Sequence, residues 1–377
     1  MIYFDNAATT PLLPSTQEVA FGNPSSPHSV GIRAERELTA ARRVMASLLN
    51  CADGELTFTS GGTESNNLAI IGAAMEHKKK GCHIITSQVE HPSVENALKV
   101  LENAGFEVTR LPISQTGEIS ASAVVDALRN DTIMVSLMHI NNETGTVFDI
   151  SNISQLVKEK NDRVLFHTDA VQSFCKEQLN MKHIDLYSLS AHKIHGAKGV
   201  GALFIRKGTR IKPLLYGGGQ QGNIRPGTEN TSGIASFGTA AECQMKSHKH
   251  IKENISAIRN ELADIVNTIE NVYINGSGSP FILNMSFLGI KGETLVHALE
   301  SEGIYISSGA ACNTKHPGQS SLYALKLGSD RVDSAVRFSF SCFNTLDEAA
   351  ICKKTVIKTV KTLRGNLTKS VSGKRRT

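Results

Sequence analysis

Short apolar runs alternate with segments of helical periodicity between residues 55 and 206, and this alternation constrains the fold more than any other feature of the chain. The apolar runs are mostly β-branched and short, as expected for strands buried inside a sheet. Strands separated by helices need crossover connections, so the pattern predicts an α/β fold with a largely parallel sheet covered by helices on both faces. The predicted strands cover residues 55–59, 83–87, 133–138, 164–168, 186–189 and 200–205, and the predicted helices between them cover 66–76, 93–104 and 153–160.

The rest of the chain predicts a second, smaller α+β domain. A glycine-rich stretch at 216–227 indicates an irregular loop, and helical periodicity from 232 to 270 indicates a helix or helix pair that connects two domains. The elements predicted beyond it are strands at 281–287, 305–307 and 335–341 and helices at 293–301 and 346–363. We therefore expect a large domain over residues 16–250 and a small domain formed by 1–15 together with 251–377.

Composition excludes several classes of protein. The 40 lysines and arginines are spread along the chain and opposed by 35 aspartates and glutamates, so no nucleic-acid footprint is expected. The basic end, residues 374–377, is interpreted as a frayed terminus. The seven cysteines form no Cys-x-x-Cys pair, which argues against a disulfide framework and a tetrathiolate zinc site and favours a reducing cytoplasm. No apolar run reaches 18 residues, so we expect a soluble protein that is not exported and does not enter a membrane.

Ligands of parallel α/β sheets bind beyond the carboxyl ends of the strands, and the residues there are unusually polar in this chain. After the first predicted strand, Gly61 and Gly62 allow the backbone to approach an anion, and Thr63 opens a helix whose free N–H groups favour phosphate. A threonine cap after an ordinary turn explains the same residues.

Four further strand ends carry groups that suit one cofactor. His91 could stack on an aromatic ring, the amides of 141–145 could bind a phenolic oxygen, and Asp169 could hold a protonated pyridine nitrogen. Lys193 is placed to form a Schiff base. Each has an ordinary alternative: His91 could be a turn residue, residues 141–145 an Asx turn, Asp169 a helix cap and Lys193 a solvated surface lysine. Together with the phosphate cradle they predict a site for pyridoxal 5′-phosphate (PLP).

Two residues of the predicted small domain complete the set. Cys312 lies in a run of small residues, 307–314, that would leave its thiol exposed, as a nucleophile requires. We interpret the other six cysteines as inert. Arg337 interrupts an apolar strand with a permanent cation that can bind a carboxylate in bidentate fashion, although a buried structural ion pair would explain it equally well.

These motifs resemble the cysteine desulfurase family of the NifS/IscS kind, relatives of the class V aminotransferases with the fold-type I PLP architecture. The resemblance covers nearly the whole chain. The matching segments are residues 5–11, 21–26, 59–66, 90–91, 141–145, 169–173, 190–193, 225–230 and 308–312.

The resemblance implies a role for each site residue. Lys193 would bond to the cofactor, Asp169 would meet its ring nitrogen, and His91 would face the ring and take part in catalysis. The cofactor phosphate would be held by Gly62, Thr63, Ser190 and His192, with Thr228 reaching it from the partner subunit of a homodimer. Gln172 and Asn142 would lie on the ring-oxygen side. Asn23, Asn142 and Arg337 would bind the substrate.

The resemblance also implies the reaction. L-cysteine would lose its sulfur to the thiolate of Cys312, alanine would leave, and the persulfide would pass to an acceptor protein for iron–sulfur clusters, tRNA thiolation or another thio-cofactor. No intrinsic metal site is expected, and Cys312 is a candidate for a transient iron–sulfur ligand. The alternatives are a selenocysteine lyase, another PLP enzyme such as an aminotransferase, and a catalytically silent sulfur-relay scaffold that binds PLP.

Overall fold

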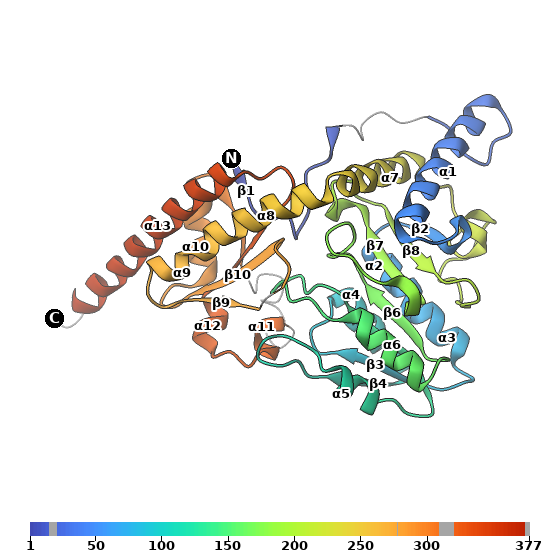
Figure 1. Cartoon of the computed structure of the whole chain (residues 1–377), viewed down its shortest axis with the longest axis horizontal. Coiled ribbons are helices and arrows are strands. Elements are labelled where there is room, and N and C mark those ends of the chain that lie inside the picture. Colours follow the sequence, from blue (N-terminus) through green and yellow to red (C-terminus); the bar gives the residue numbers. More distant parts are fainter. Residues whose placement is uncertain (15–20, 277, 309–319, 374–377) are drawn as a thin grey trace.

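The structure is a computed structural model of the whole chain (Figure 1). It describes residues 1–14, 21–276, 278–308 and 320–373, with the backbone alone for 366–373. Most of the chain folds around two sheets that lie side by side, joined by the helices α7 and α8 (Figure 1). The larger sheet positions the strand ends that the sequence singles out.

The large sheet has seven strands in the order β2-β8-β7-β6-β5-β3-β4. They are β2 (Leu56–Thr59), β3 (His83–Ser87), β4 (Glu107–Leu111), β5 (Thr132–Met138), β6 (Leu165–Asp169), β7 (Leu186–Ser190) and β8 (Gly201–Ile205). Neighbours from β7 to β4 pair in parallel, whereas β8 runs antiparallel to both β2 and β7. The predicted α/β fold with a mainly parallel sheet is therefore confirmed.

The sequence prediction missed β4 at the outer edge of this sheet. The strand pairs with β3 alone, and only Leu111 of its five residues is buried. An edge strand that is half exposed carries charged residues such as Glu107 and Arg110, so it lacks the continuous apolar run by which the other strands are recognised.

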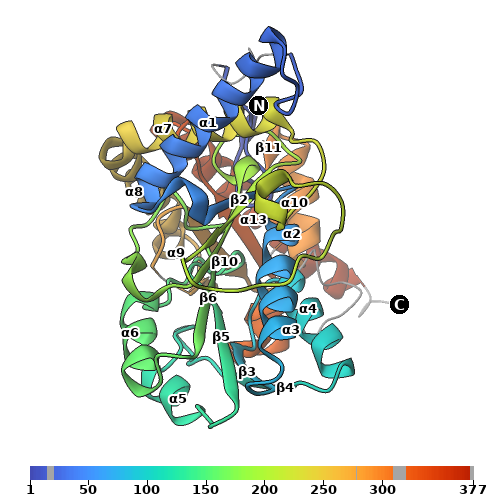
Figure 2. The ribbon, with the colours of Figure 1, turned by 90° about the vertical axis from the view of Figure 1, so that its right-hand side faces the viewer.

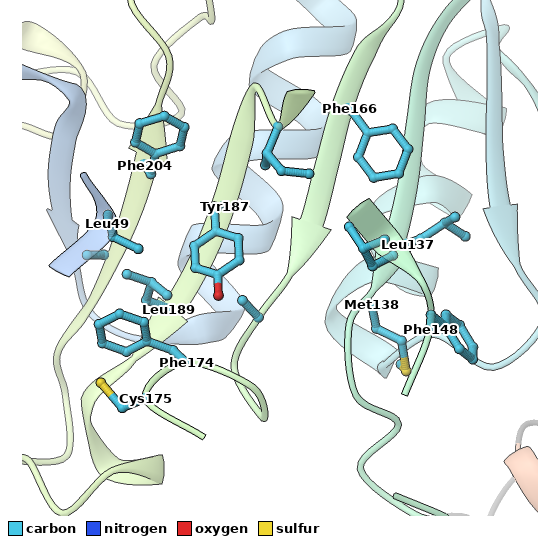
Figure 3. Packing of buried hydrophobic residues seen from close by; sticks show 14 of the residues in the cluster. Leu49, Leu137, Met138, Phe148, Phe166, Phe174, Cys175, Tyr187, Leu189 and Phe204 are labelled. Carbon is cyan, nitrogen blue, oxygen red and sulfur yellow. The ribbon is translucent and has the colours of Figure 1, made fainter. Parts of the chain in front are cut away.

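Helices cover both faces of the large sheet. Figure 2 shows α6 on one side of the strands and α3 and α4 on the other. Successive strand residues alternate between the two layers: Ile84 packs in the core beneath α3 and α4, and Ile85 packs in the core beneath α1 and α6 (Figure 3 shows part of this second core). These helices are α1 (Ser29–Leu49), α2 (Gly62–Asn67), the π-helical turn η3 (Leu68–Gly72), α3 (Ala73–His77), α4 (Pro92–Asn103), α5 (Ala121–Asp126), α6 (Ile150–Lys160) and α7 (Thr231–Lys246).

The small sheet is antiparallel in the order β12-β13-β10-β9. Its strands are β9 (Val272–Asn275), β10 (Ile282–Phe287), β12 (Ser307–Ser308) and β13 (Ala335–Ser339). The nearby helices are α8 (His248–Ala263), α9 (Ile265–Thr268), α10 (Gly292–Glu300), α11 (Ser321–Ala324), α12 (Ser329–Asp333) and α13 (Leu346–Gly373). The chain start joins this unit, because Phe4 lies in its core and β1 (Ile2–Tyr3) pairs with β11 (Ile304–Tyr305).

Two predicted elements are divided in the structure. The helical segment predicted over 232–270 consists of α7, α8 and α9, with a break at Ser247, whose ψ of 13° is not helical. The strand predicted at 305–307 is split between β11 and β12, which belong to different sheets. The domain boundaries at residues 16 and 250 stay a prediction. Within the described residues, no helix has the length and apolar character needed to cross a membrane.

Candidate active site

The carboxyl ends of the large sheet and the first residues of the chain surround a cavity of about 390 Å³. Most of the predicted site residues line it, although they come from five different strand ends and from β13 of the small sheet. These residues are Gly62, Thr63, His91, Asn142, Asp169, Gln172, Ser190, His192, Lys193 and Arg337.

Three predicted residues are not placed there. Asn23 is exposed ahead of α1, where its Oδ1 accepts a hydrogen bond from the backbone N–H of Ser25 at 3.0 Å. Thr228 is exposed directly after the glycine-rich loop, and the resemblance assigns it to the site of a partner subunit. Cys312 lies outside the described residues. The roles of these three residues stay predictions.

The turn after β2 and the end of β7 form the part of the cavity predicted to hold a phosphate. Gly61 has a φ of 153°, and a Cβ at Gly62 would lie 2.6 Å from Val171, so the backbone packs more closely than a larger residue permits. No side chain caps the first amides of α2. The hydroxyl of Ser190 is buried without a hydrogen-bond partner among the described residues. An unpaired buried hydroxyl beside free helix amides fits the phosphate of PLP.

Asp169 presents a carboxylate whose orientation is fixed by two donors. Its Oδ1 accepts from the backbone N–H of Val171 at 3.0 Å, and its Oδ2 accepts from Nδ2 of Asn66 at 2.7 Å. A buried carboxylate held in this way suits a protonated ring nitrogen. The sequence analysis missed Asn66, because its partner lies 103 residues away and no local pattern indicates the contact.

His91 is held in one tautomer by Ser93, a second residue that the sequence analysis missed. The backbone N–H of Ser93 donates to Nδ1 of His91 at 3.2 Å, so the neutral ring carries its proton on Nε2. The Ser93 hydroxyl lies 2.8 Å from the same Nδ1 and accepts from Asn66 at 2.8 Å, which links His91 to Asp169. Burial lowers the pKa of His91; Asp169 opposes this shift and Lys193 adds to it.

Lys193 is anchored by the first loop of the chain. Its Nζ donates to the carbonyl oxygens of Ala7 at 2.6 Å and Ala8 at 2.7 Å, and Gln172 also donates to Ala7 at 2.9 Å. The amine therefore lies in the same cavity as Asp169 and His91. This is the arrangement that a lysine needs to bond to an aldehyde held between those residues.

The contacts of Arg337 are compatible with both predictions made from the sequence, a structural ion pair and a carboxylate-binding residue. It forms an ion pair with Asp5 at 2.8 Å and donates to the backbone oxygen of Asn142 at 2.8 Å, as a structural arginine would. It also lines the cavity, and its Nε is buried without a partner among the described residues. A partly paired guanidinium at a cavity wall can still bind a carboxylate.

Residues 2–351 match the family described as Aminotransferase class-V. The chain belongs to the class-V aminotransferase family. It is 42% identical over 364 residues to the NifS/IcsS protein homolog of Lactobacillus delbrueckii subsp. bulgaricus, covering 93% of this chain and 94% of that protein. It is 40% identical over 361 residues to cysteine desulfurase IscS of Dictyoglomus turgidum, covering 92% and 91%. A solved NifS-like protein superposes with a TM-score of 0.90 at 32% identity, covering 96% of this chain and 99% of that chain.

This member of the class-V aminotransferase family has a buried lysine, Lys176, that the sequence analysis also missed. Its Nζ lies 3.5 Å from Oε1 of Gln172. Burial, and secondarily the charge of Lys193, lower the pKa of Lys176 to about 7.

The imidazole of His192 is neutral, so it can donate or accept a hydrogen bond but carries no charge. Burial, assisted by the charges of Lys193 and Lys198, lowers the pKa of His192 to about 4. Its ring is therefore uncharged at pH 7, so it would contact a phosphate through a hydrogen bond and not through an ion pair.

The Ser93 link predicts a measurable loss when it is removed. In Ser93→Ala the hydroxyl contacts to His91 and Asn66 disappear, and we expect kcat to fall about 5-fold, as for the loss of about 1 kcal/mol of hydrogen bonding, with KM for the substrate unchanged. Steady-state kinetics check this, with exposed Ser122→Ala as the matched control. An unaltered kcat in Ser93→Ala would show that His91 needs no support from Ser93.

Glu90, directly before His91, predicts a pH effect on stability. Burial raises its pKa to about 8, while Ser87 and the N–H of Met138 donate to Oε1 and oppose that shift. The folded state therefore retains a proton that the unfolded state loses above about pH 4.5, so stability falls as pH rises from about 5 to 8.

The isosteric variant Glu90→Gln removes this titration. We compare the free energy of unfolding of the variant with that of the wild type at each pH. The difference should shift in favour of the variant by roughly 1–3 kcal/mol between pH 5 and pH 8. Urea unfolding at the two pH values measures this difference. Equal pH dependence in both proteins would mean that Glu90 titrates normally.

Proposed function

We propose that the chain is a PLP-dependent cysteine desulfurase that converts L-cysteine to L-alanine and leaves the sulfur on Cys312. The observation that carries this proposal is the convergence of Lys193, Asp169 and the unpaired Ser190 hydroxyl on one cavity. These are an amine for an aldehyde, an acceptor for a ring N–H and a donor for a phosphate. The NifS and IscS names of relatives that cover more than nine-tenths of the chain support the substrate.

The bound cofactor supplies an acceptor for the electrons released at the substrate Cα. The protein holds it through residues with distinct tasks. Asp169 would accept from the protonated ring nitrogen, Ser190, His192 and the amides after Gly61 would hold the phosphate, and His91 would contact the ring. Gln172 and Asn142 bind the ring-oxygen side.

The substrate is positioned from the opposite wall. Arg337 binds its carboxylate through the guanidinium edge that Asp5 and Asn142 leave available, and Asn142 assists. Asn23 remains a candidate for the same task. Lys193 moves the proton at the substrate Cα, and His91, with its proton on Nε2, can give or take a second one.

Cys312 completes the reaction as nucleophile. Its thiolate attacks the substrate sulfur, the Cβ–S bond breaks and a new S–S bond forms. L-cysteine and a protein thiol thus become L-alanine and a protein persulfide. Atoms and electrons balance, and no external oxidant is needed.

The protein acts as a homodimer in the cytoplasm and passes its sulfur to an acceptor protein. Two exposed large apolar side chains support the dimer, because Phe21 is 86% and Tyr216 84% exposed in the single chain. A partner subunit covering these loops would bring Thr228 to a second cavity. The acceptor would receive the persulfide of Cys312 for an iron–sulfur cluster, a thiolated tRNA or another thio-cofactor, with Cys312 as a transient iron–sulfur ligand.

A substrate panel tests the proposal against its alternatives. Purified holoprotein should release alanine from L-cysteine, with a persulfide formed in equal amount. Selenocysteine as the only productive substrate would indicate a selenocysteine lyase, and amino-group transfer to a 2-oxo acid would indicate an aminotransferase. Absence of alanine from a fully loaded protein would indicate a silent scaffold.

A further inference from the structure

The turn that follows β5, residues 141–145, connects parts of the molecule that are distant in the sequence. Oδ1 of Asn141 accepts hydrogen bonds from the backbone N–H groups of Glu143 at 3.0 Å and Thr144 at 2.9 Å. Gly145 has a φ of 75°, which suits glycine. This local network gives the turn one defined shape, so groups attached to it are held relative to one another.

One face of the turn holds the chain that follows Cys312. Oε2 of Glu143 accepts from the hydroxyl of Ser320 at 2.8 Å and from the backbone N–H of Ser321 at 2.9 Å. Nδ2 of Asn141 donates to the Ser321 hydroxyl at 2.9 Å. Three hydrogen bonds thus attach two residues that come eight and nine positions after Cys312.

The other face of the turn belongs to the cavity. Asn142 lines the cavity, and its backbone oxygen accepts from Arg337 at 2.8 Å. Arg337 in turn pairs with Ser307 across β12 and β13. Before Cys312, Ser307 and Ser308 pair with Arg337 and its neighbour Val336. After Cys312, Ser320 and Ser321 bind Glu143 and Asn141, the two neighbours of Asn142.

We propose that Glu143 is a positioning residue for sulfur removal: it ties Ser320 and Ser321, which follow Cys312 in the sequence, to the turn that carries Asn142 and receives Arg337. The inference rests on the proposed function of Cys312. The side chain suits this task because one of its oxygens accepts from both the Ser320 hydroxyl and the Ser321 N–H. Burial raises the pKa of Glu143, and these two donors and Arg337 oppose that shift. The described residues before and after Cys312 are attached next to Arg337 and Asn142, which line the cavity, so loss of the Glu143 contacts would release one of these two attachments.

The proposal predicts a defect confined to one step. In Glu143→Ala, the rate of persulfide formation in a single turnover should fall about 10-fold or more, because misplacement of a reacting group by about 1 Å is enough for such a loss. Cofactor content and KM for cysteine should change little, since Lys193, Asp169 and Arg337 are retained. Glu143→Gln, which keeps one acceptor oxygen, should recover part of the rate.

Ser320→Ala provides a second variant that keeps Glu143 in place. It removes one of the three hydrogen bonds, and we expect a loss of about 3- to 5-fold in the same single-turnover rate. The exposed residue Glu118, changed to glutamine, is the matched control and should behave as the wild type. Persulfide is followed by mass spectrometry of quenched samples, and alanine is measured in the same samples.

The outcomes separate this inference from the proposed function. Wild-type persulfide rates in both Glu143→Ala and Ser320→Ala would overturn the inference. A large rise in KM with an unchanged single-turnover rate would also overturn it, since Glu143 would then act on the substrate pocket. Cys312→Ala, tested in parallel, addresses the function itself: wild-type alanine release from that variant would refute the role of Cys312 whatever the Glu143 variants do.

Discussion

Replacement of Lys193 by alanine is expected to abolish covalent attachment of the cofactor and to lower turnover of cysteine by roughly 10³-fold or more, because the proposed function assigns to this one residue both the bond to PLP and the proton transfer at the substrate Cα. The amine lies within 2.7 Å of two backbone carbonyls at the cavity wall, and no other lysine lines this cavity among the described residues. The visible absorption of the protein and the release of alanine measure the two effects.

The control for this variant is Lys182→Ala, which removes an exposed lysine that does not line the cavity. It should retain the absorption and the rate of the wild type. Turnover in Lys193→Ala within a few-fold of the wild type would exclude Lys193 as the residue that carries the cofactor.

Replacement of Cys312 by alanine is expected to remove the proposed sulfur acceptor and to leave the residues that line the cavity unchanged. We expect alanine release from cysteine to fall about 10²- to 10³-fold, as for loss of a catalytic nucleophile, while the cofactor absorption and its change on adding cysteine persist. Stopped-flow absorption and alanine assays separate substrate binding from sulfur removal.

Exposed Cys243, changed to serine, is the matched control and should have no effect on either measurement. Persulfide formed at wild-type level in Cys312→Ala would mean that a different thiol receives the sulfur. The assignment of the other six cysteines as inert would then be wrong.

Local sequence patterns predicted the central strands and the residues at their ends. The reason is physical: a strand buried on both faces must be apolar along its length, and a polar residue directly after it must lie at the ligand-binding edge of a parallel sheet. Asp169, His91 and Lys193 were predicted in this way, and all three line one cavity in the structure. The edge strand β4 was missed because it is only partly buried.

Residues that act through distant partners could not be predicted in the same way. Asn66 reaches Asp169 and Ser93, and Glu143 reaches Ser320, 177 positions away. Each belongs to a short polar run that ordinary helix starts and turns also contain, so its partner appears only when the chain is folded. Buried Lys176 likewise gives no local signal, because its burial follows from tertiary packing.

The most direct test of the account is to locate the cofactor on the chain. Holoprotein is reduced with borohydride, which converts a cofactor–lysine linkage into a stable bond, then digested and mapped by mass spectrometry. The account predicts that the peptide containing Lys193 carries the pyridoxyl phosphate group. An unmodified Lys193 in protein that holds a full complement of cofactor would contradict it.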